Sequence, residues 1–306
     1  MIKTNDERAL RFTHVLATAL VALATLALLS KATHAAEVAL EPGQRVILVT
    51  GSTGGLGREV ALALAASGDH VILHGRNEER AREVIAAIEA EGNGSAQFYR
   101  ADLASLAETR ELADSIIADY DRLDVLVNNA GVFLPKQSER RLTGDGYELH
   151  FQVNYLAGYL LAERLRPLLA ASRPSRIINV ASGQRPLNFD DLMFEENYSG
   201  MDAYLRSKNA QIMMAFAMAD ELEADGITIV AMHPSSFMNT DMVIEAGYEP
   251  KSSVDTGRDA VLQLINEDMG TGKFFNVFVE DEAIPEAYDT NAQQRLLEVS
   301  RQLISE

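Results

Sequence analysis

A glycine-rich turn between a predicted strand and a predicted helix is the feature that most constrains this chain. The run 45–49 is rich in β-branched residues, which predicts a short buried strand. The sequence TGSTGGLG follows at 50–57, and a helical pattern covers 59–67. This order aims backbone N–H groups and a helix N-terminus at a phosphate. A glycine-rich hairpin is the alternative, but the βα context favours dinucleotide binding.

The end of the next predicted strand, 70–74, indicates which dinucleotide is bound. In dinucleotide-binding folds an acidic residue near this point takes the ribose 2′-hydroxyl, whereas an Arg accommodates a 2′-phosphate. Positions 73–77 hold no Asp or Glu, but they hold Arg76, and Ser52 could add a hydroxyl to the same phosphate. The sequence therefore favours NADP(H), with NAD(H) as the alternative. Arg76 could instead be a solvated residue that begins the helix expected over 78–90.

Tyr204 and Lys208 form a candidate proton-transfer pair. Residues four apart on a helix share a face, so the ammonium would lie beside the phenol. A neighbouring positive charge favours the phenolate and lowers the pKa of a tyrosine. This tuning suits a hydroxyl that must act as an acid or base near neutral pH. The pair alone could equally be an ordinary helix face.

Several motifs in the expected order resemble those of the short-chain dehydrogenase/reductase family, and more narrowly its retinol-dehydrogenase-like branch. The glycine turn fits the TGxxxGxG pattern of this family. Asp102 and Leu103, after the third predicted strand, resemble the pair that holds the adenine ring. The run NNAG at 128–131 follows a predicted strand at 123–127 and resembles the motif that supports the sheet and borders the cofactor. The resemblance covers residues from about 44 to the C-terminus.

The resemblance implies a catalytic tetrad of Asn154, Ser182, Tyr204 and Lys208. Tyr204 would exchange a proton with the substrate oxygen, and Ser182 would hydrogen-bond the same oxygen. Lys208 would lower the phenol pKa and grip the nicotinamide ribose. Asn154, in a helix expected over 146–170, would anchor a water chain to Lys208. The long interval between Ser182 and Tyr204 resembles the insert of retinol-dehydrogenase-like enzymes.

One stretch departs from the family pattern. The family follows its sixth strand with Pro-Gly and a Thr five residues after the Pro. Here the predicted strand 227–232 is followed by Pro234, Ser235 stands where Gly is usual, and Thr240 comes one residue late. The register of the expected nicotinamide contact is therefore uncertain. The residues expected to bind the cofactor are Gly51, Ser52, Thr53, Gly55, Leu56, Gly57, Arg76, Asp102, Leu103, Asn128, Ala130, Gly131, Tyr204, Lys208, Pro234 and Thr240.

Strand and helix patterns alternate from 46 to about 279 without a Pro/Gly/Ser-rich linker. This predicts a single α/β domain with a doubly wound parallel sheet of the Rossmann type, layered α/β/α. The formal net charge of -18 argues against nucleic acid as a partner. The chain has no Cys, which excludes thiol catalysis and Cys–zinc sites, and we expect no metal at His70 and His74. The sequence leaves the oligomeric state open, with a homo-oligomer among the options.

Residues 1–36 read as a leader that precedes the catalytic domain at 37–306. Lys3, Arg8 and Arg11 come before an apolar run at 12–29, and small residues follow it up to Ala36. This describes either a cleaved signal peptide or an N-terminal membrane anchor at the lower limit of a membrane span. We therefore expect a membrane-associated or exported protein. A start of translation further downstream, which would leave a cytoplasmic enzyme, is the alternative.

In the family that this chain resembles, the segment after the sixth strand walls the substrate cleft, and apolar side chains there favour a lipophilic alcohol, aldehyde or ketone as the substrate. The segment 234–255 and the insert each carry several such side chains, and flexible thioethers suit irregular apolar ligands. They could equally close the fold against its own core. They are Phe237, Met238, Met242, Val243, Ile244 and Tyr248, with Phe189, Leu192, Met193 and Phe194 in the insert. A non-catalytic NADP-binding redox sensor or scaffold is the alternative function, which the retained tetrad disfavours.

Overall fold

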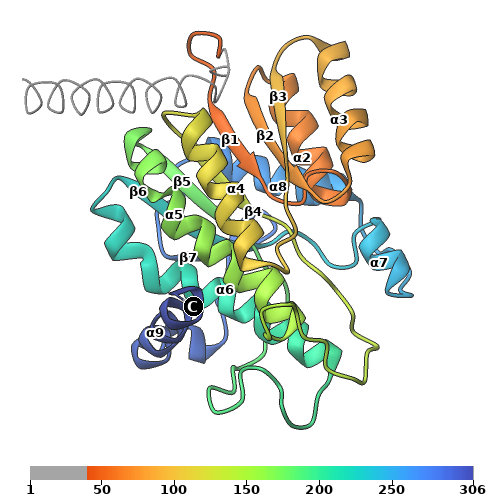
Figure 1. Cartoon of the computed structure of the whole chain (residues 1–306), viewed down its shortest axis with the longest axis vertical. Coiled ribbons are helices and arrows are strands. Elements are labelled where there is room, and N and C mark those ends of the chain that lie inside the picture. The colour runs from red at the N-terminus through yellow and green to blue at the C-terminus, as the bar shows by residue number, and fades with distance from the viewer. Residues whose placement is uncertain (1–39, 306) are drawn as a thin grey trace, which may run out of the picture. The chain divides into compact units, whose positions relative to one another are not determined.

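An eight-stranded sheet organises residues 40–305, the part of the chain that this computed structural model describes (Figure 1). Its strand order is β3-β2-β1-β4-β5-β6-β7-β8, and every neighbouring pair is parallel except β7 with β8. The strands are β1 Val46–Val49, β2 His70–Gly75, β3 Ser95–Arg100, β4 Val125–Asn128, β5 Ser175–Val180, β6 Ile227–His233, β7 Lys273–Asn276 and β8 Val279–Glu280.

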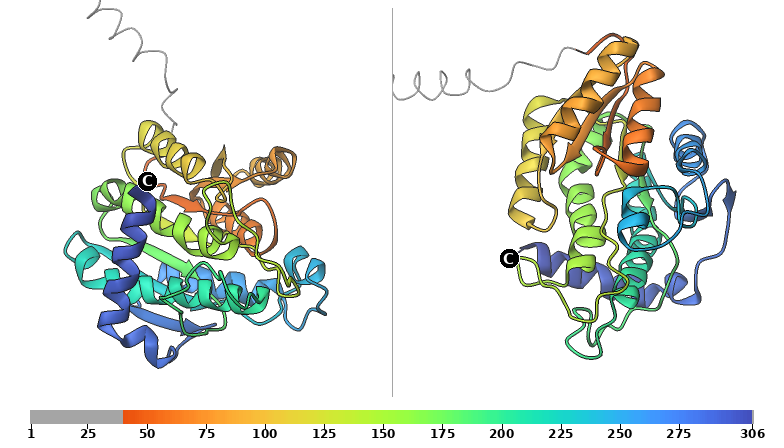
Figure 2. Two further views of the ribbon diagram at one scale, coloured as in Figure 1. Left: turned by 60° about the horizontal axis from the view of Figure 1, so that its bottom comes forward. Right: turned by 90° about the vertical axis from the view of Figure 1, so that its right-hand side faces the viewer.

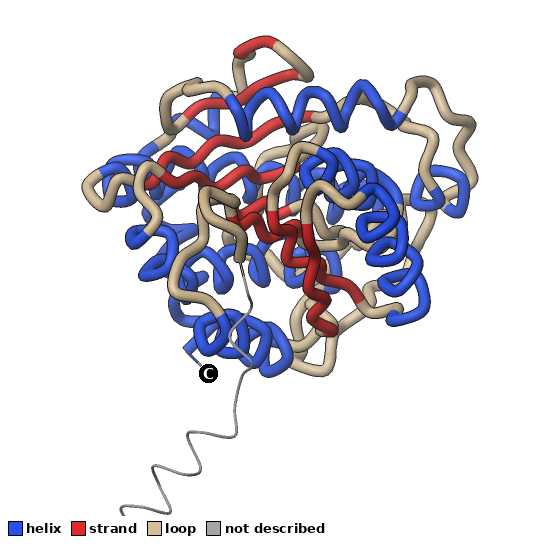
Figure 3. The backbone as a smooth tube through the Cα atoms, turned by 90° about the horizontal axis from the view of Figure 1, so that it is seen from above, coloured by secondary structure: helices blue, strands red, loops and turns tan. Residues whose placement is uncertain are grey.

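Helices cover both faces of this sheet (Figure 2; Figure 3). α2, α3 and α8 pack on one face, where their apolar side chains share a core with the strands. α4, α5 and α6 pack on the other, and α9 lies against α6. The helical elements are α2 Gly55–Ala66, α3 Glu78–Glu91, α4 Leu106–Asp119, η1 Phe151–Leu156, α5 Ala157–Ala171, α6 Gly200–Glu223, α7 Asp241–Glu245, α8 Val254–Asn266, η2 Pro285–Tyr288 and α9 Thr290–Ser305.

The doubly wound parallel sheet expected from the sequence is confirmed. Every residue of β1 and β2 is buried, as in a parallel sheet covered on both faces. The chain runs outward through β1, β2 and β3, then returns to place β4 on the other side of β1. Ligands of such folds bind beyond the carboxyl ends of the strands at this switch point. The glycine turn follows β1 and the NNAG run begins at the last residue of β4, so both lie at that place.

The helix predicted over 146–170 begins later than expected. Leu142 and Glu148 pair in an isolated antiparallel bridge, and Gly146 turns the chain with a φ of +86°. Helical backbone starts at Leu149 and passes through the π-helix η1 before α5. The pattern of the sequence misplaced this boundary because the glycine adopts a left-handed turn instead of a helical conformation. π-helical turns are frequent at functional sites.

The predictions for residues 1–36, including the apolar run 12–29, lie outside the described residues. Within 40–305, no helix combines the length and apolar character that crossing a membrane requires.

Candidate active site

The glycine turn has a shape that only glycine accommodates at its key positions. Gly51 and Gly55 have φ values of +66° and +52°. A Cβ on Gly57 would lie 2.4 Å from the Gly51 carbonyl oxygen and 2.5 Å from Asn129 Nδ2. A Cβ on Gly51 would lie 2.9 Å from Ala130 Cα. The turn is therefore held against the NNAG run at backbone distance.

Side chains from both segments lock this contact. Asn129 Nδ2 donates to the Thr50 carbonyl oxygen at 2.8 Å. Thr50 Oγ1 accepts from the backbone N–H groups of Asn129 and Ala130 at 2.9 and 3.0 Å. The side chain of Asn128 is buried and donates to Asn179 Oδ1 at 2.9 Å. Asn128, expected at the cofactor, thus joins β4 to β5 by its amide group.

Ser52 is placed differently from the expectation that its hydroxyl would reach a 2′-phosphate. It is fully buried, and its Oγ accepts from the backbone N–H of His74 at 2.9 Å. His74 Nδ1 in turn accepts from the Gly51 N–H at 3.1 Å, and Nε2 lies 3.2 Å from the Ala101 carbonyl oxygen. Burial lowers the pKa of His74 to about 4, so the imidazole is neutral. Sequence reasoning weighed His74 only as a metal ligand and missed this structural role.

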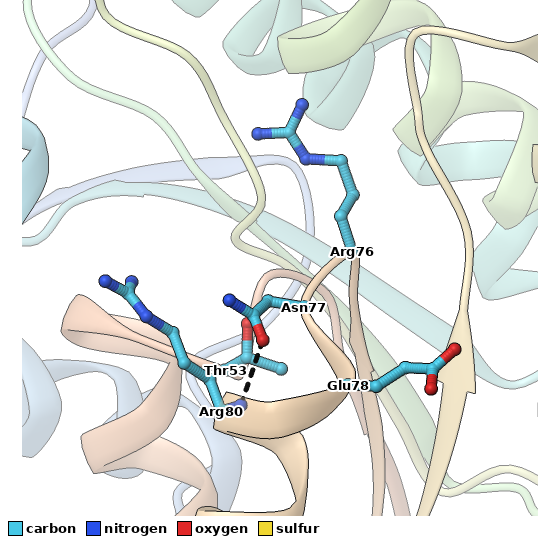
Figure 4. Close-up of a pocket in the computed structure, with 5 residues that line it drawn as sticks. All are labelled: Thr53, Arg76, Asn77, Glu78 and Arg80. Atoms are coloured by element: carbon cyan, nitrogen blue, oxygen red, sulfur yellow. Dashed lines mark hydrogen bonds between the residues drawn. The ribbon is translucent and has the colours of Figure 1, made fainter.

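A pocket beside the turn is lined by Thr53, Arg76, Asn77, Glu78 and Arg80 and has a volume of about 560 Å³ (Figure 4). Arg76 and Arg80 extend on either side of Asn77, while Glu78 points away from them. Arg76 Nη1 lies 3.6 Å from Asp102 Oδ2, and Arg80 Nη1 lies 3.3 Å from Asp241 Oδ2. The sequence analysis named Arg76 and Thr53 but missed Arg80. A second cation in the first turn of the predicted helix was the available signal.

This cradle fits the phosphates of a dinucleotide. Gly54, the N-cap of α2, has no side chain to bond the first N–H groups of the helix. A phosphate can accept from such groups and is favoured by the helix dipole. Two guanidinium groups stand next to this N-terminus, as a further phosphate requires. Hence the residues present fit a dinucleotide that carries an additional phosphate on its ribose.

The other expected cofactor residues lie around the cradle. A Cβ on Gly55 would lie 3.5 Å from Thr240 Cγ2, so Thr240 contacts the turn despite its shifted register. Pro234 and Leu56 both pack at Gly257 of α8. Asp102 Oδ1 accepts from the Ala104 N–H at 3.0 Å, and Leu103 is buried beside it in sequence.

Lys208 is a buried ammonium with two fixed acceptors. Its Nζ donates to the Val180 carbonyl oxygen at 2.8 Å and to Gln211 Oε1 at 2.9 Å. Nζ also lies 5.9 Å from the centroid of the Tyr204 ring. Burial lowers the pKa of Lys208 to about 7. Both protonation states of this amine are therefore accessible near neutral pH.

The phenol of Tyr204 departs from the expectation of a lowered pKa. Burial raises its pKa, while a hydrogen bond with the Ser182 side chain lowers it by a smaller amount. The desolvation of the phenolate thus outweighs its stabilisation in this arrangement. Lys208 stabilises the phenolate only weakly, because burial has also lowered the pKa of its amine. The Ser182 contact joins the end of β5 to α6, as the tetrad requires.

Asn154 lies in η1, and both polar atoms of its amide are hydrogen-bonded. Oδ1 accepts from the Val132 N–H at 2.7 Å, and Nδ2 donates to Ser207 Oγ at 2.9 Å. A Cβ on Gly131 would lie 3.2 Å from Asn154 Oδ1 and 3.6 Å from Lys208 Nζ. Gly131 therefore lies between these two side chains and leaves room for both. The structure brings Asn154, Lys208 and Tyr204 to one place beyond the ends of β4 and β5.

A buried acid–imidazole pair supports this site and was not anticipated. Glu148 and His150 are fully buried, and His150 Nδ1 lies 2.8 Å from Glu148 Oε1. His150 Nε2 accepts from the Leu134 N–H at 3.2 Å, and its ring meets the Tyr204 ring edge-on at 6.3 Å. Glu148 Oε2 accepts from the Phe151 N–H at 2.8 Å. The signal in the sequence was a Glu and a His two residues apart, between the apolar or aromatic residues at 147, 149 and 151.

Aromatic rings extend from Tyr204 toward the segment that contains α7. Phe133 lies 4.5 Å from Tyr204 between ring centroids and 5.9 Å from Tyr248. Phe237 lies 5.1 Å from Tyr248. We call these four residues, Tyr204, Phe133, Tyr248 and Phe237, the aromatic wall. It provides the apolar surface expected next to the phenol.

The apolar residues of the insert pack elsewhere. The guanidinium of Arg206 lies over the Phe194 ring at 4.4 Å, and that of Arg295 lies over Phe189 at 5.0 Å. Met193 Sδ accepts from the Glu148 N–H at 3.4 Å. In the described residues these side chains anchor the insert, and the apolar surface next to Tyr204 comes mainly from the aromatic wall. No group of three or more His, Asp or Glu side chains within 40–305 could hold a metal ion.

Comparison with known proteins agrees with this site. The family model of the short chain dehydrogenases matches residues 45–250. Retinol dehydrogenase 13 of Homo sapiens is 33% identical over 285 residues, which cover 86% of this chain and 85% of that protein. This chain belongs to the short-chain dehydrogenase/reductase family. The retinol dehydrogenase relatives place it in the retinol-dehydrogenase-like branch, as the motifs indicated.

Solved structures share the fold. A crystal structure of an uncharacterised protein from Mycobacterium paratuberculosis has a TM-score of 0.71 and 25% identity, covering 87% of this chain and 95% of that chain. A short-chain dehydrogenase of Shigella flexneri complexed with NADP has a TM-score of 0.64 and 28% identity, covering 79% and 99%. The protein is therefore an oxidoreductase of alcohols and carbonyls with a nicotinamide cofactor.

Proposed function

We propose that this protein interconverts an alcohol and a carbonyl on a small lipophilic substrate with NADP(H), using Tyr204, Lys208, Ser182 and Asn154. The observation that carries the proposal is the convergence of these side chains beyond β4 and β5, next to a glycine cradle and two arginines. The aromatic wall supports an apolar substrate. The name of the similar Retinol dehydrogenase 13 gives a lipophilic alcohol as the substrate of that protein.

In the reductive direction the bound nicotinamide supplies the hydride, and this chain supplies the proton and the geometry. Tyr204 gives its phenolic proton to the carbonyl oxygen as the hydride arrives. Ser182 donates a hydrogen bond to the same oxygen and holds it within reach of the phenol. The raised pKa of Tyr204 keeps the proton on the phenol until the oxygen gains charge. In the oxidative direction the same groups remove the proton of the alcohol.

Lys208 returns the proton to Tyr204. An ammonium has three N–H donors, and Val180 and Gln211 accept two of them. The third is available to a ribose hydroxyl. Because the pKa of Lys208 is about 7, the amine can release and regain a proton near neutral pH. Asn154, on the other side of Gly131, would hold the water through which the proton is resupplied.

A direct assay tests this function. Purified protein is mixed with NADPH or NADH and a panel of aldehydes and ketones, and nicotinamide absorbance is followed. We expect oxidation of NADPH with apolar carbonyl compounds. Tight NADPH binding without turnover of any carbonyl or alcohol would contradict the proposal and indicate a sensor of NADP.

Cofactor preference depends, in our proposal, on Arg76 as a partner of the 2′-phosphate. Arg76→Asp replaces a cation by a carboxylate, which repels phosphate and can accept from a ribose hydroxyl. A hydrogen bond to a charged group contributes about 1.5–3 kcal/mol, so NADPH affinity should fall about tenfold or more. NADH affinity should be retained or rise. Fluorescence titration of both cofactors measures the change.

Arg82→Asp is the matched control because it makes the same charge change on α3. Arg82 is exposed, lies 3.8 Å from Glu78 as an ion pair, and does not line the pocket. Equal loss of NADPH affinity in both variants would show that only net charge matters. An unchanged preference in Arg76→Asp would show that Arg76 merely precedes a helix.

We propose that residues 1–36 direct the protein to or across a membrane and that the catalytic domain folds without them. β1 starts only at Val46, after a turn at 42–43. A variant that lacks 1–36 should therefore be soluble and active, while the full chain expressed in a bacterium should enter the membrane fraction or pass beyond it. Cell fractionation and the intact mass distinguish a cleaved signal from an anchor. A mass that corresponds to a chain beginning near Glu37 indicates a cleaved signal. Full-length protein found wholly in the cytosol would contradict the proposal.

A further inference from the structure

Three lysines lie over the faces of the aromatic wall. Lys208 Nζ lies 5.9 Å from the centroid of Tyr204, at the proposed catalytic end. Lys136 Nζ lies 5.1 Å from the centroid of Tyr248, and Lys251 Nζ lies 4.9 Å from that of Phe237. Lys136 and Lys251 come from different segments, yet both are at the far end of the wall. The wall therefore has a cation at the phenol and two more at its outer end.

The two outer cations have no acidic partner among the described residues. Lys136 and Lys251 form no ion pair there, whereas Lys273 on β7 pairs with Glu280 at 2.8 Å. The exposed carboxylates of the α7 segment, Glu245 and Glu249, form no ion pair with either lysine. In a chain with a formal net charge of -18, these two ammonium groups give this end of the aromatic wall a local positive charge.

Contact with a ring does not satisfy an ammonium. The face of an aromatic ring attracts the cation but cannot accept its three N–H donors as oxygen does. Lys136 Nζ uses one donor on the Gly247 carbonyl oxygen at 3.0 Å, which joins the loop after β4 to the α7 segment. The other donors of Lys136 and those of Lys251 face solvent, because both side chains are exposed. They are available to an oxygen anion.

We propose that Lys136 and Lys251 bind the carboxylate of an amphiphilic substrate whose carbonyl group lies at Tyr204 and whose apolar body lies on the aromatic wall. This inference rests on the proposed function at the same site and narrows its substrate class to apolar aldehydes and ketones that carry an anionic group. Two ring-to-ring contacts separate Tyr204 from Tyr248, so the anionic group must be remote from the carbonyl.

The charge of the rest of the chain strengthens the argument. A strongly acidic protein repels anions at long range, so an anionic substrate needs a local positive region within about one Debye length, roughly 8 to 10 Å. Lysine offers a compact charge with rotatable donors, which suits a carboxylate that arrives in several orientations. The aromatic rings beneath the ammonium groups bind the apolar part of the same molecule.

A matched pair of substrates tests the proposal. 4′-Formylbiphenyl-4-carboxylate and its neutral carboxamide share a rigid biaryl body and differ in the charge of the group opposite the aldehyde. For the full-length protein we expect a higher kcat/KM for the carboxylate. Exposed ion pairs contribute about 0.2–1 kcal/mol each, so Lys136→Gln and Lys251→Gln should each lower the carboxylate-to-carboxamide ratio by up to about fivefold. The double variant should remove most of the preference.

Two controls separate this effect from general electrostatics. Lys273→Gln makes the same charge change at an ion pair on the edge strands and should leave the ratio unchanged. Raising the salt from about 0.05 to about 0.5 M should reduce the preference of the unaltered protein, because exposed charges are screened. A ratio that falls equally in all three single variants would overturn the proposal, as would equal kcat/KM for both compounds in the unaltered protein.

A binding measurement keeps the inference testable without turnover. Calorimetric titration of each compound into the NADP⁺-loaded protein gives the affinity ratio directly, and the same variants should reduce it. If neither compound is turned over but the carboxylate still binds better, the proposed reaction fails and the anion site stands. If both are reduced with no preference for the carboxylate, the reaction stands and this inference fails.

Discussion

Tyr204→Phe is expected to abolish turnover while NADPH affinity stays nearly unchanged. Phenylalanine keeps the ring that packs on Phe133 at 4.5 Å and removes only the hydroxyl that bonds Ser182. General acid–base catalysis is worth about a hundred- to ten-thousand-fold in rate, so kcat should fall by at least that order. Steady-state assays give kcat, and quenching of protein or cofactor fluorescence gives the affinity for NADPH.

Tyr288→Phe is the matched control because it deletes the same atom in η2. Tyr288 stacks on Phe216 and accepts a hydrogen bond from the Ala283 N–H at 2.9 Å, so its loss tests stability and not chemistry. This variant should keep its kcat. Activity of Tyr204→Phe within a few-fold of the unaltered protein would exclude Tyr204 as the proton donor.

The fold could be predicted from the sequence because its core depends on local patterns. The β-branched runs before 50 and 75 form β1 and β2 within one residue of the expected bounds. Their full burial explains why the aliphatic residues 46–49 and 71–73 are consecutive and do not alternate with polar residues. The prediction that a helix begins at 146 was wrong for a local reason as well. Gly146 adopts φ +86°, and a glycine in a polar run allows either a turn or a helix.

Residues of the candidate site that belong to a motif with fixed spacing were predicted from the sequence. Contacts between residues that are far apart in the sequence were missed. Thr53, Arg76 and Tyr204 follow motifs, and each lies at the cradle or the tetrad. The hydrogen bond from the Gly51 N–H to His74 Nδ1 joins the turn after β1 to β2, and no spacing pattern in the sequence predicts it. A second hydrogen bond to His74 explains Ser52: its hydroxyl points inward because the backbone N–H of His74 in β2 is a buried donor to it.

The electrostatics of the tetrad also lay beyond the sequence. The spacing in the sequence placed Lys208 near Tyr204, but it could not predict how deeply each is buried. Burial raises the pKa of Tyr204 and lowers the pKa of Lys208. Desolvation depends on everything that packs around a group, including Phe133 from the loop after β4. Phe237 and Tyr248 of the aromatic wall were expected from the sequence, but Phe133, Lys136 and Lys251 were missed because their contacts with the wall join segments that are far apart in the sequence.

Lys208→Met should abolish turnover and change the pH dependence of stability. Burial lowers the pKa of Lys208 from 10.5 to about 7, so between these pH values the unfolded chain holds a proton that the folded protein has released. The free energy of unfolding should therefore rise with pH from about 7 to about 10, by up to about 1.4 kcal/mol per pH unit. Below pH 7 both states are protonated and the full cost of the buried charge is present.

Methionine has a similar length and no charge, so the variant should lose this pH dependence. Near pH 6 the variant avoids the cost of burying the lysine charge, which is several kcal/mol. This gain is offset by about 1–3 kcal/mol for each acceptor left unpaired, here the Val180 carbonyl oxygen and Gln211 Oε1.

Urea unfolding between about pH 6 and 10 gives the free energy of unfolding of both proteins, and the contributions of other titrating groups cancel in the difference. Lys273→Met, which removes a lysine charge from a half-buried ion pair with Glu280 away from the tetrad, is the control variant. Parallel curves for Lys208→Met and the unaltered protein would show that the lysine keeps its ordinary pKa. Divergent curves with a more stable, inactive variant would show that the fold gives up stability to hold a charge where proton transfer needs it.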